Sequence, residues 1–254
     1  MQSSISVIIL AAGLGTRMKS RLAKVLHRAG GLTLVEHVVR AANAICDAGS
    51  ITVVTGHQAD EVESRLEPYG VRFARQKEQK GTGHAVLSCA GQLRERPGFV
   101  VILYGDCPLL EAETLRALIA AHQAQGAPAA TVLTTELADP TGYGRIVRDP
   151  CGRVSAIVEQ KAATEEQKGI REINSGIYCF DAALLWQELP EITPNPASGE
   201  YYLTDIVERF NAGGHRVQAF SIADAHQILG INHRVELAEA DRILRERKAR
   251  ELML

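Results

Sequence analysis

The sequence has few cysteines, few aromatic residues and no long apolar segment. Its five cysteines form no C-x-x-C pair, so they predict neither a zinc site nor a disulfide framework (Cys46, Cys89, Cys107, Cys151 and Cys179). No apolar run approaches the roughly 18 residues of a membrane-spanning helix, and no basic leader precedes the first apolar run. We therefore expect a cytoplasmic protein that does not enter a membrane.

An excess of charge of one sign is also missing. The 28 basic and 30 acidic residues nearly balance, which gives a formal net charge of −2. Without a large field of either sign, the chain is expected to bind neither nucleic acid nor a membrane surface, and any anion must be held by local charges. At 254 residues the chain is long enough for one large hydrophobic core.

Apolar runs alternate with helical patterns in the first half of the chain. Strands are expected at 5–11, 51–55, 71–74, 99–104 and 129–135. The clearest helical pattern covers 33–48, where apolar residues fall on one face. This alternation predicts an α/β fold, a Rossmann-like and mostly parallel open sheet with helices on both faces.

The pattern changes after Pro140. Expected there are a hairpin (142–147 and 154–158), a strand (173–180), a proline-containing loop (190–199), a helix (200–210) and a last strand (216–222). The sequence thus predicts a domain over 1–232, with a part of about 1–136 followed by a small β-rich part of about 137–232. A charged helix over 233–254 follows, either as a solvated terminal helix or as a connector to a further segment.

The most informative motif is an apolar run that ends in a two-glycine turn. Gly13 and Gly15 leave backbone N–H groups uncovered, and Arg17 and Lys24 add positive charge beside them. The motif is neither a dinucleotide fingerprint, because Met18 replaces the third glycine, nor a Walker loop, because no Gly-Lys-Ser/Thr follows. It predicts a phosphate-binding loop; the alternative is a tight strand-to-helix turn.

A second apolar strand ends in Gly105 and Asp106. In an open parallel sheet this aspartate reaches the same edge as the glycine loop. A single carboxylate there suits Mg²⁺, which takes one or two protein oxygens and completes its shell with water and phosphates. The alternative is an ordinary aspartate in the turn after a strand.

Glycines precede a helical pattern a third time at 76–85. The Gln76 amide can donate and accept, as recognition of a pyrimidine edge requires, while Gly81 and Thr82 offer close backbone and hydroxyl contacts. The alternative is a turn and helix N-cap. His84 is expected only to begin the helix.

Together these motifs resemble the uridylyltransferase half of the bacterial N-acetylglucosamine-1-phosphate uridylyltransferase family. The resemblance rests on L-A-A-G-L-G-T-R-M, K-V-L-H, Q-K-E-Q-K-G-T-G-H-A, Y-G-D, G-Y-G-R-I, V-E-Q-K, E-I-N, E-Y-Y-L-T-D and G-I-N, which follow in this order. Related nucleotidyltransferases share the first loop but not the whole series, so the joint match is specific.

The resemblance implies a nucleotide-diphospho-sugar transferase fold and a Mg²⁺-dependent reaction. UMP would pass from UTP to N-acetylglucosamine 1-phosphate, which gives UDP-N-acetylglucosamine for cell-envelope synthesis, and pyrophosphate. The part at about 1–136 would bind the nucleotide and the part at about 137–232 the sugar. A related enzyme for another base or sugar, and a catalytically silent nucleotide-binding module, stay open as alternatives, although a silent module would usually lose Asp106 or Arg17.

The resemblance also assigns roles to residues. Those implied to hold the uridine are Leu10, Ala11, Ala12, Gly13, Gln76 and Gly81, with Thr82 near the sugar. Tyr104 and Gly105 complete the substrate site, and the sugar pocket would be lined by Gly144, Glu159 and Asn174. Asp106 and Asn232 would hold the magnesium ion, although Asn232 alone suggests a helix N-cap. We assign Arg17 to the triphosphate and leaving pyrophosphate, and Lys24 to the reacting phosphates.

The chain departs from the family in two ways. Ala23 replaces the family's proline before Lys24, which frees φ and restores an N–H, so a less preorganised loop is expected. The family's left-handed β-helix acetyltransferase domain is missing, so the chain is either a truncated piece or a free-standing transferase. We expect a monomer or weak dimer in this form, and a trimer where that domain is present.

Overall fold

The computed structural model describes residues 4–124, 126, 128–196 and 198–253. Ala197 of the predicted loop and Leu254 of the predicted terminal helix lie outside them, as do residues 1–3, 125 and 127.

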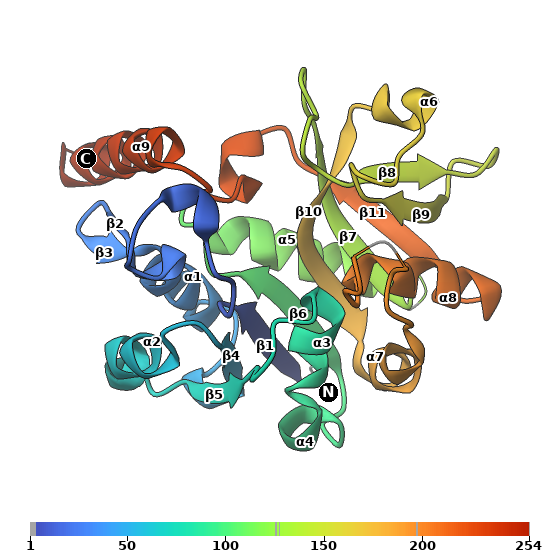
Figure 1. The fold of residues 1–254 in the computed structure, drawn as a ribbon, viewed down its shortest axis with the longest axis horizontal. Helices are drawn as coiled ribbons and strands as arrows, with labels where there is room; N and C mark the ends of the chain where they lie inside the picture. The colour runs from blue at the N-terminus through green and yellow to red at the C-terminus, as the bar shows by residue number, and fades with distance from the viewer. Residues whose placement is uncertain (1–3, 125, 127, 197, 254) are drawn as a thin grey trace.

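Among the described residues, nine strands form one mixed, mostly parallel sheet (Figure 1). At its centre β1 (Ile5–Leu10) lies between β6 (Phe99–Tyr104) and β4 (Ile51–Thr55), and β5 (Arg72–Arg75) follows β4, all parallel. On the other side β10 (Glu172–Asp181) runs antiparallel between β6 and β7 (Ala130–Glu136), and β11 (Val217–Ser221) lies parallel to β7. The predicted mostly parallel open sheet is confirmed.

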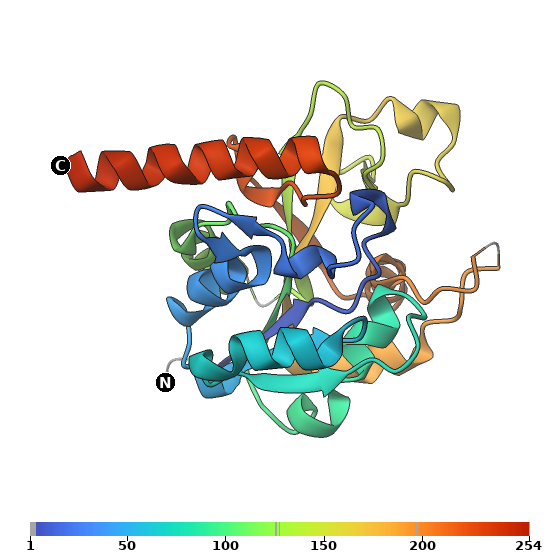
Figure 2. The same cartoon turned by 60° about the vertical axis from the view of Figure 1, so that its left-hand side comes forward.

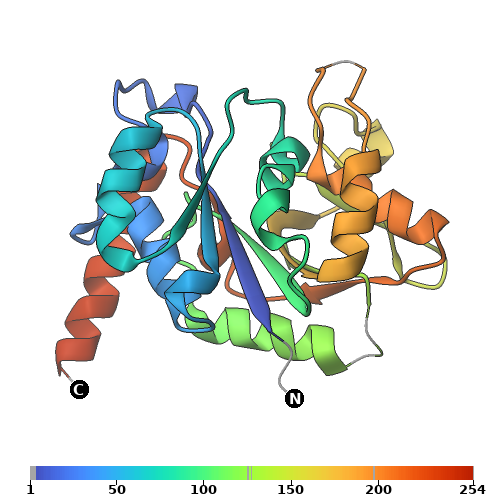
Figure 3. The ribbon, with the colours of Figure 1, turned by 90° about the horizontal axis from the view of Figure 1, so that it is seen from below.

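Helices cover both faces of the sheet, as predicted (Figure 3). One face carries α1 (Leu34–Asn43), α2 (Ala59–Leu66) and α5 (Ala112–Ala124), and the other carries α3 (Thr82–Leu87), α4 (Ala90–Leu93), α7 (Ala182–Glu188) and α8 (Ile206–Ala212). Side chains alternate along a strand, so β1 sends Val7 and Ile9 into the first core and Ile8 and Leu10 into the second. Both cores therefore hold the strand that ends at the glycine loop.

The predicted hairpin is formed by β8 (Arg145–Arg148) and β9 (Val154–Val158), with the short helix α6 (Glu165–Lys168) after it. The hairpin joins the main sheet through β8, which pairs with the early part of β10. Between Asn174 and Tyr178 the register of β10 against β7 shifts, so β10 serves both the main sheet and the hairpin. The division of the domain near residue 136 stays a prediction.

Two predicted helices differ from the observed ones. The pattern at 33–48 ends as a helix at Asn43, where the N–H groups of Ala44 and Ile45 turn to carbonyls three residues back and tighten the last turn. The helix expected at 200–210 begins at Ile206, after a 3-10 turn (Leu203–Asp205), and ends at Ala212. Its predicted start is wrong because the backbone of Tyr201 bonds a distant loop.

The long polar helix at the C-terminal end, α9 (Arg234–Met253), extends beyond the rest of the chain (Figure 2). Leu237, Ile243 and Leu244 pack it against Met18 and neighbouring apolar side chains, and the two-strand ribbon β2 (Arg28–Ala29) and β3 (Leu32–Thr33) lies beside it. Leu252 is 75% exposed, so packing is confined to one part of the helix. Among the described residues, no helix is long and apolar enough to cross a membrane.

His122 on α5 gives the fold a pH dependence. Its side chain is fully buried against Phe99, Nδ1 lies 2.8 Å from Thr131 Oγ1, and Nε2 has no hydrogen-bond partner within the part of the chain that the structure describes. Burial lowers the pKa of this imidazole from 6.5 to about 4. At a pH between these two values, His122 is therefore neutral in the folded protein and protonated in the unfolded chain.

We predict that the free energy of unfolding falls as the pH drops from about 6.5 toward 4, with His122 contributing on the order of 3 kcal/mol at the acid end. Urea unfolding of the wild type and of His122→Asn at several pH values measures this. The variant is expected to show a shallower acid slope, and His226→Asn, at an exposed imidazole, is the control. Equal slopes in all three proteins would contradict the assignment.

Candidate active site

The glycine loop and the aspartate loop meet at the carboxyl ends of β1 and β6. The N–H of Gly105 donates to the carbonyl of Leu10 at 2.9 Å. A Cβ on Gly105 would lie 3.3 Å from the Cβ of Ala11, so a larger residue there would push the loops apart. Parallel pairing of β1 with β6 thus places Asp106 beside the Leu10–Gly13 segment.

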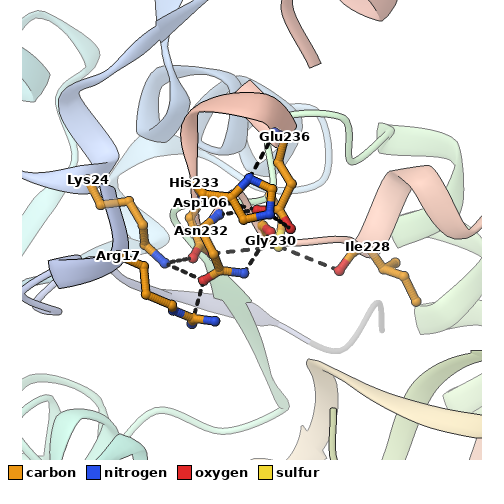
Figure 4. A network of polar contacts seen from close by, with 9 residues as sticks. Arg17, Lys24, Asp106, Ile228, Gly230, Asn232, His233 and Glu236 are labelled. Carbon is orange, nitrogen blue, oxygen red and sulfur yellow. Dashed lines mark hydrogen bonds and ion pairs between the residues drawn. The ribbon is translucent and has the colours of Figure 1, made fainter. Parts of the chain in front are cut away.

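Four polar side chains from four segments form a cluster at this edge (Figure 4). The ammonium of Lys24 is ion-paired with Asp106 and lies 3.4 Å from Asn232 Oδ1. Arg17 Nη2 donates to the same Asn232 oxygen at 2.7 Å. The side chains of Lys24 and Asp106 are only 16% and 12% exposed, so water screens this pair weakly.

The segment that carries Asn232 is fastened to Asp106. The N–H of Ile231 donates to the Asp106 carbonyl at 2.9 Å, and a Cβ on Gly230 would lie 3.3 Å from Asp106 Oδ2. The backbone N–H of Asn232 donates to Glu236 Oε2 at 2.5 Å, and its side-chain nitrogen donates to the Gly230 carbonyl at 3.0 Å. These contacts leave the side-chain oxygen of Asn232 to face the two cations.

The alternative role of Asn232 as a helix N-cap is therefore wrong. Helix α9 begins at Arg234, and His233 precedes it, with Nδ1 accepting from the Glu236 N–H at 3.3 Å.

The oxygens of Asp106 and Asn232 fit a magnesium ion. Both already contact one cation, the Lys24 ammonium. The described residues hold no group of three or more His, Cys, Asp or Glu that could form an all-protein metal cage. Mg²⁺ does not need one, because it keeps waters and takes one or two protein oxygens beside phosphates.

Gln76 lies just after β5 and is only 4% exposed. Its side-chain nitrogen donates to the Gly81 carbonyl at 3.1 Å and lies 3.0 Å from His84 Nδ1. Since the Gly81 carbonyl can only accept, the amide orientation is fixed and both N–H groups are used. Gln76 Oε1 has no hydrogen-bond partner among the described residues, so Gln76 presents an acceptor.

His84 is a site residue that the sequence does not reveal. It was expected only to begin a helix, and it lies in α3, whose first residue is Thr82. Its contact with Gln76 depends on a turn whose shape cannot be deduced from residue types.

Residues 201–204 cross over the Gln76–Thr82 loop. The N–H of Tyr201 donates to the Lys80 carbonyl at 2.8 Å, and a Cβ on Gly81, at φ +101°, would lie 2.5 Å from the Tyr201 carbonyl oxygen. The N–H of Leu203 donates to Thr82 Oγ1 at 3.0 Å. This crossing segment therefore fixes Gly81 and Thr82, and it takes the place of the first part of the helix predicted at 200–210, which begins at Ile206.

Gly144, Glu159 and Asn174 lie together in the hairpin region. The N–H of Asn174 donates to the Gly144 carbonyl at 2.9 Å, and a Cβ on Gly144 would lie 3.5 Å from Glu159 Oε1. Thr204 of the crossing segment donates to Glu159 at 3.4 Å. Burial, then the negative charges of Asp205 and of Glu200, raise the pKa of the Glu159 carboxyl.

Tyr104 stands at the end of β6 and links the two groups of residues. Burial, then the carboxylates of Glu159 and Asp106, raise the pKa of its hydroxyl. Gly176 packs against the Tyr104 ring, where a Cβ would lie only 2.4 Å from a ring carbon, so the register shift in β10 requires glycine there. The Tyr104 hydroxyl therefore stays protonated and uncharged between the carboxylates of Asp106 and Glu159.

Comparison with known proteins shows the family of the chain. Residues 7–174 match the model of the MobA-like NTP transferase domain family. The chain belongs to this family. This MobA-like NTP transferase chain is 52% identical over 253 residues to the bifunctional protein GlmU of Solibacter usitatus, which covers 100% of the chain and 54% of that relative. Identity to the GlmU of Geobacter metallireducens is 51% over 251 residues, covering 98% of the chain and 52% of that relative.

The chain thus spans about half the length of the curated relatives it matches. Among solved structures, a Bacillus anthracis protein described as a glucose-1-phosphate thymidylyltransferase matches with a TM-score of 0.71 and 22% identity, over 95% of this chain and 96% of that one. This likeness confirms the predicted nucleotide-diphospho-sugar transferase fold of the MobA-like chain.

Proposed function

We propose that the chain transfers UMP from UTP to N-acetylglucosamine 1-phosphate and releases pyrophosphate. The observation that carries this proposal is the cluster of Arg17, Lys24, Asp106 and Asn232 at the shared edge of β1 and β6. The GlmU relatives support it, because each is about half identical over nearly the whole chain. We also place nucleotide binding in about 1–136 and sugar binding in about 137–232.

The reaction needs alignment and positive charge more than acid–base chemistry. A phosphate oxygen of the sugar phosphate attacks the α-phosphorus of UTP, and the bond to the bridging oxygen of pyrophosphate breaks. This oxygen is already largely ionised near neutral pH, so no general base is required. Arg17 binds the triphosphate and then the leaving pyrophosphate, while Lys24 draws the reacting phosphates together.

Lys24 must exchange partners during this reaction. Its ammonium is ion-paired with Asp106 in the structure, and phosphate oxygens compete for the same charge. Once Lys24 turns to the phosphates, the oxygens of Asp106 and Asn232 would be the groups that hold Mg²⁺. The bound ion would supply further positive charge to the phosphate oxygens.

Base and sugar recognition follow from the hydrogen-bonding groups on either side. Gln76 Oε1 is an acceptor for a ring N–H such as N3–H of uracil. Glu159 accepts from sugar hydroxyls, and Asn174 offers an amide to the acetamido group. A sugar or base that leaves such buried groups unpaired is rejected strongly.

Pyrophosphate release tests the proposed function directly. We expect release from UTP only when N-acetylglucosamine 1-phosphate and Mg²⁺ are both present, and loss of release on adding a chelator. A panel of other nucleoside triphosphates and sugar 1-phosphates is the comparison. Faster release with a different pair would overturn the substrate assignment.

Arg17→Ala and Asp106→Ala should each lower turnover by on the order of 100- to 1000-fold, because each removes a charge preorganised at the reacting phosphates. Both residues lie at the sheet edge, so the melting temperature should stay near that of the wild type. Steady-state kinetics beside melting curves measure this, with Arg40→Ala on the surface of α1 as the control. Near-native turnover in Asp106→Ala would remove the metal assignment.

Gln76→Ala and Asn174→Ala form a crossed pair. The first should raise KM for UTP more than KM for the sugar phosphate, and the second should do the reverse, since each removes hydrogen bonds to one substrate only. Initial rates with each substrate varied in turn give both constants. Equal effects of either change on both substrates would argue against separate base and sugar pockets.

A further inference from the structure

The turn between β4 and α2 contacts both loops that carry positive charge. The side-chain oxygen of Gln58 in this turn accepts from the N–H of Ala23 at 2.5 Å. The N–H of His57 donates to the Ala12 carbonyl at 3.3 Å, and a Cβ on Gly56 would lie 2.9 Å from the Cβ of Ala12. Residues 56–58 therefore support the glycine loop and the residue before Lys24 at once.

Gln58 adopts a backbone conformation that side chains rarely take. Its φ is +51°, in the left-handed region that favours glycine. It also stands at the N-cap of α2, yet its side chain makes no capping hydrogen bond. The side chain bonds Ala23 instead, which lies 35 residues away in the sequence. The left-handed backbone of Gln58 therefore accompanies this contact between two loops.

Ala23 has the conformation of a proline without its ring. Its φ of −53° and ψ of 137° lie within the range that the pyrrolidine ring imposes, and the residue is 1% exposed. An alanine here carries an N–H that must be satisfied when buried, and Gln58 satisfies it. The expected loss of preorganisation at Ala23 is therefore offset by a hydrogen bond.

The conformation of Ala23 determines the position of the Lys24 backbone. Lys24 opens a 3-10 turn (Lys24–Leu26) in which the Leu26 N–H donates to the Ala23 carbonyl at 2.9 Å. On its other side Lys24 packs closely against Gly15, since a Cβ added to Gly15 would lie 2.5 Å from the Cβ of Lys24. A shift of Ala23 would move the Lys24 backbone and its ammonium.

We propose that Gln58 is a positioning residue for the reaction, which holds Ala23 by its N–H and thereby aims Lys24 at the reacting phosphates. It does by a side-chain hydrogen bond what a prolyl ring at position 23 does by covalent constraint. This inference rests on the proposed function of Lys24.

Gln58→Gly tests the proposal, because glycine accepts the left-handed backbone without strain, and the relief of that strain offsets the cost of leaving the Ala23 N–H without its acceptor. We expect the melting temperature to be kept, the Ala23 amide proton to exchange faster by NMR, and kcat to fall roughly 10- to 100-fold, since small misplacement of a reacting group is costly. Adding Ala23→Pro to Gln58→Gly should restore kcat, because the ring replaces the lost constraint.

Ala23→Pro alone completes the cycle and should stay near wild-type turnover, with the Gln58 side chain turned away from the ring. Unchanged turnover in Gln58→Gly, or a double variant as slow as Gln58→Gly, would overturn the positioning role. A wild-type chain that releases no pyrophosphate would overturn the proposed function instead. Amide exchange at Ala23, measured without substrate, would then still decide whether Gln58 holds this loop.

Discussion

The ion pair between Lys24 and Asp106 is the interaction on which the rest of the site depends. Both side chains are largely withdrawn from water, so their attraction is weakly screened and fixes where the Lys24 ammonium lies. The pair is formed only because parallel strands bring the end of β6 beside the loop that follows β1. Asn232 then adds one neutral oxygen that bonds both Lys24 and Arg17, so three charged groups share one geometry.

Two irregular segments join the Gln76–Thr82 loop, the hairpin region and the end of β6. The crossing segment contacts Thr82 through Leu203 and Glu159 through Thr204, so it spans the proposed base and sugar pockets. At the register shift in β10, Asn174 bonds Gly144, and Gly176 packs on the ring of Tyr104, which precedes the loop that carries Asp106. Each of the two segments therefore contacts two parts of the candidate site, which suits the proposed reaction between two bound anions.

The sequence predicts those parts of the site that follow from local patterns. An apolar run followed by Gly13 or by Gly105 predicts a strand that ends in a loop. Because the carboxyl ends of parallel strands lie at the same edge of a sheet, the two loops are predicted to meet there. The predicted start of the helix at 200–210 is wrong because the backbone of Tyr201 bonds Lys80 and Gly83, and no local pattern shows such a contact. Gln58 carries no signal either, since a glutamine before a helix is an ordinary surface residue.

In the proposed reaction Lys24 needs a fixed backbone and a movable ammonium, and the structure separates these two requirements. The backbone is held at Ala23 by Gln58 and after Lys24 by the turn through Leu26. The four-carbon side chain is left free to exchange Asp106 for phosphate, which costs little because a flexible ammonium has no preferred direction. A more rigid guanidinium would bind a carboxylate through two hydrogen bonds and release it less readily, so lysine suits the position where partners must change.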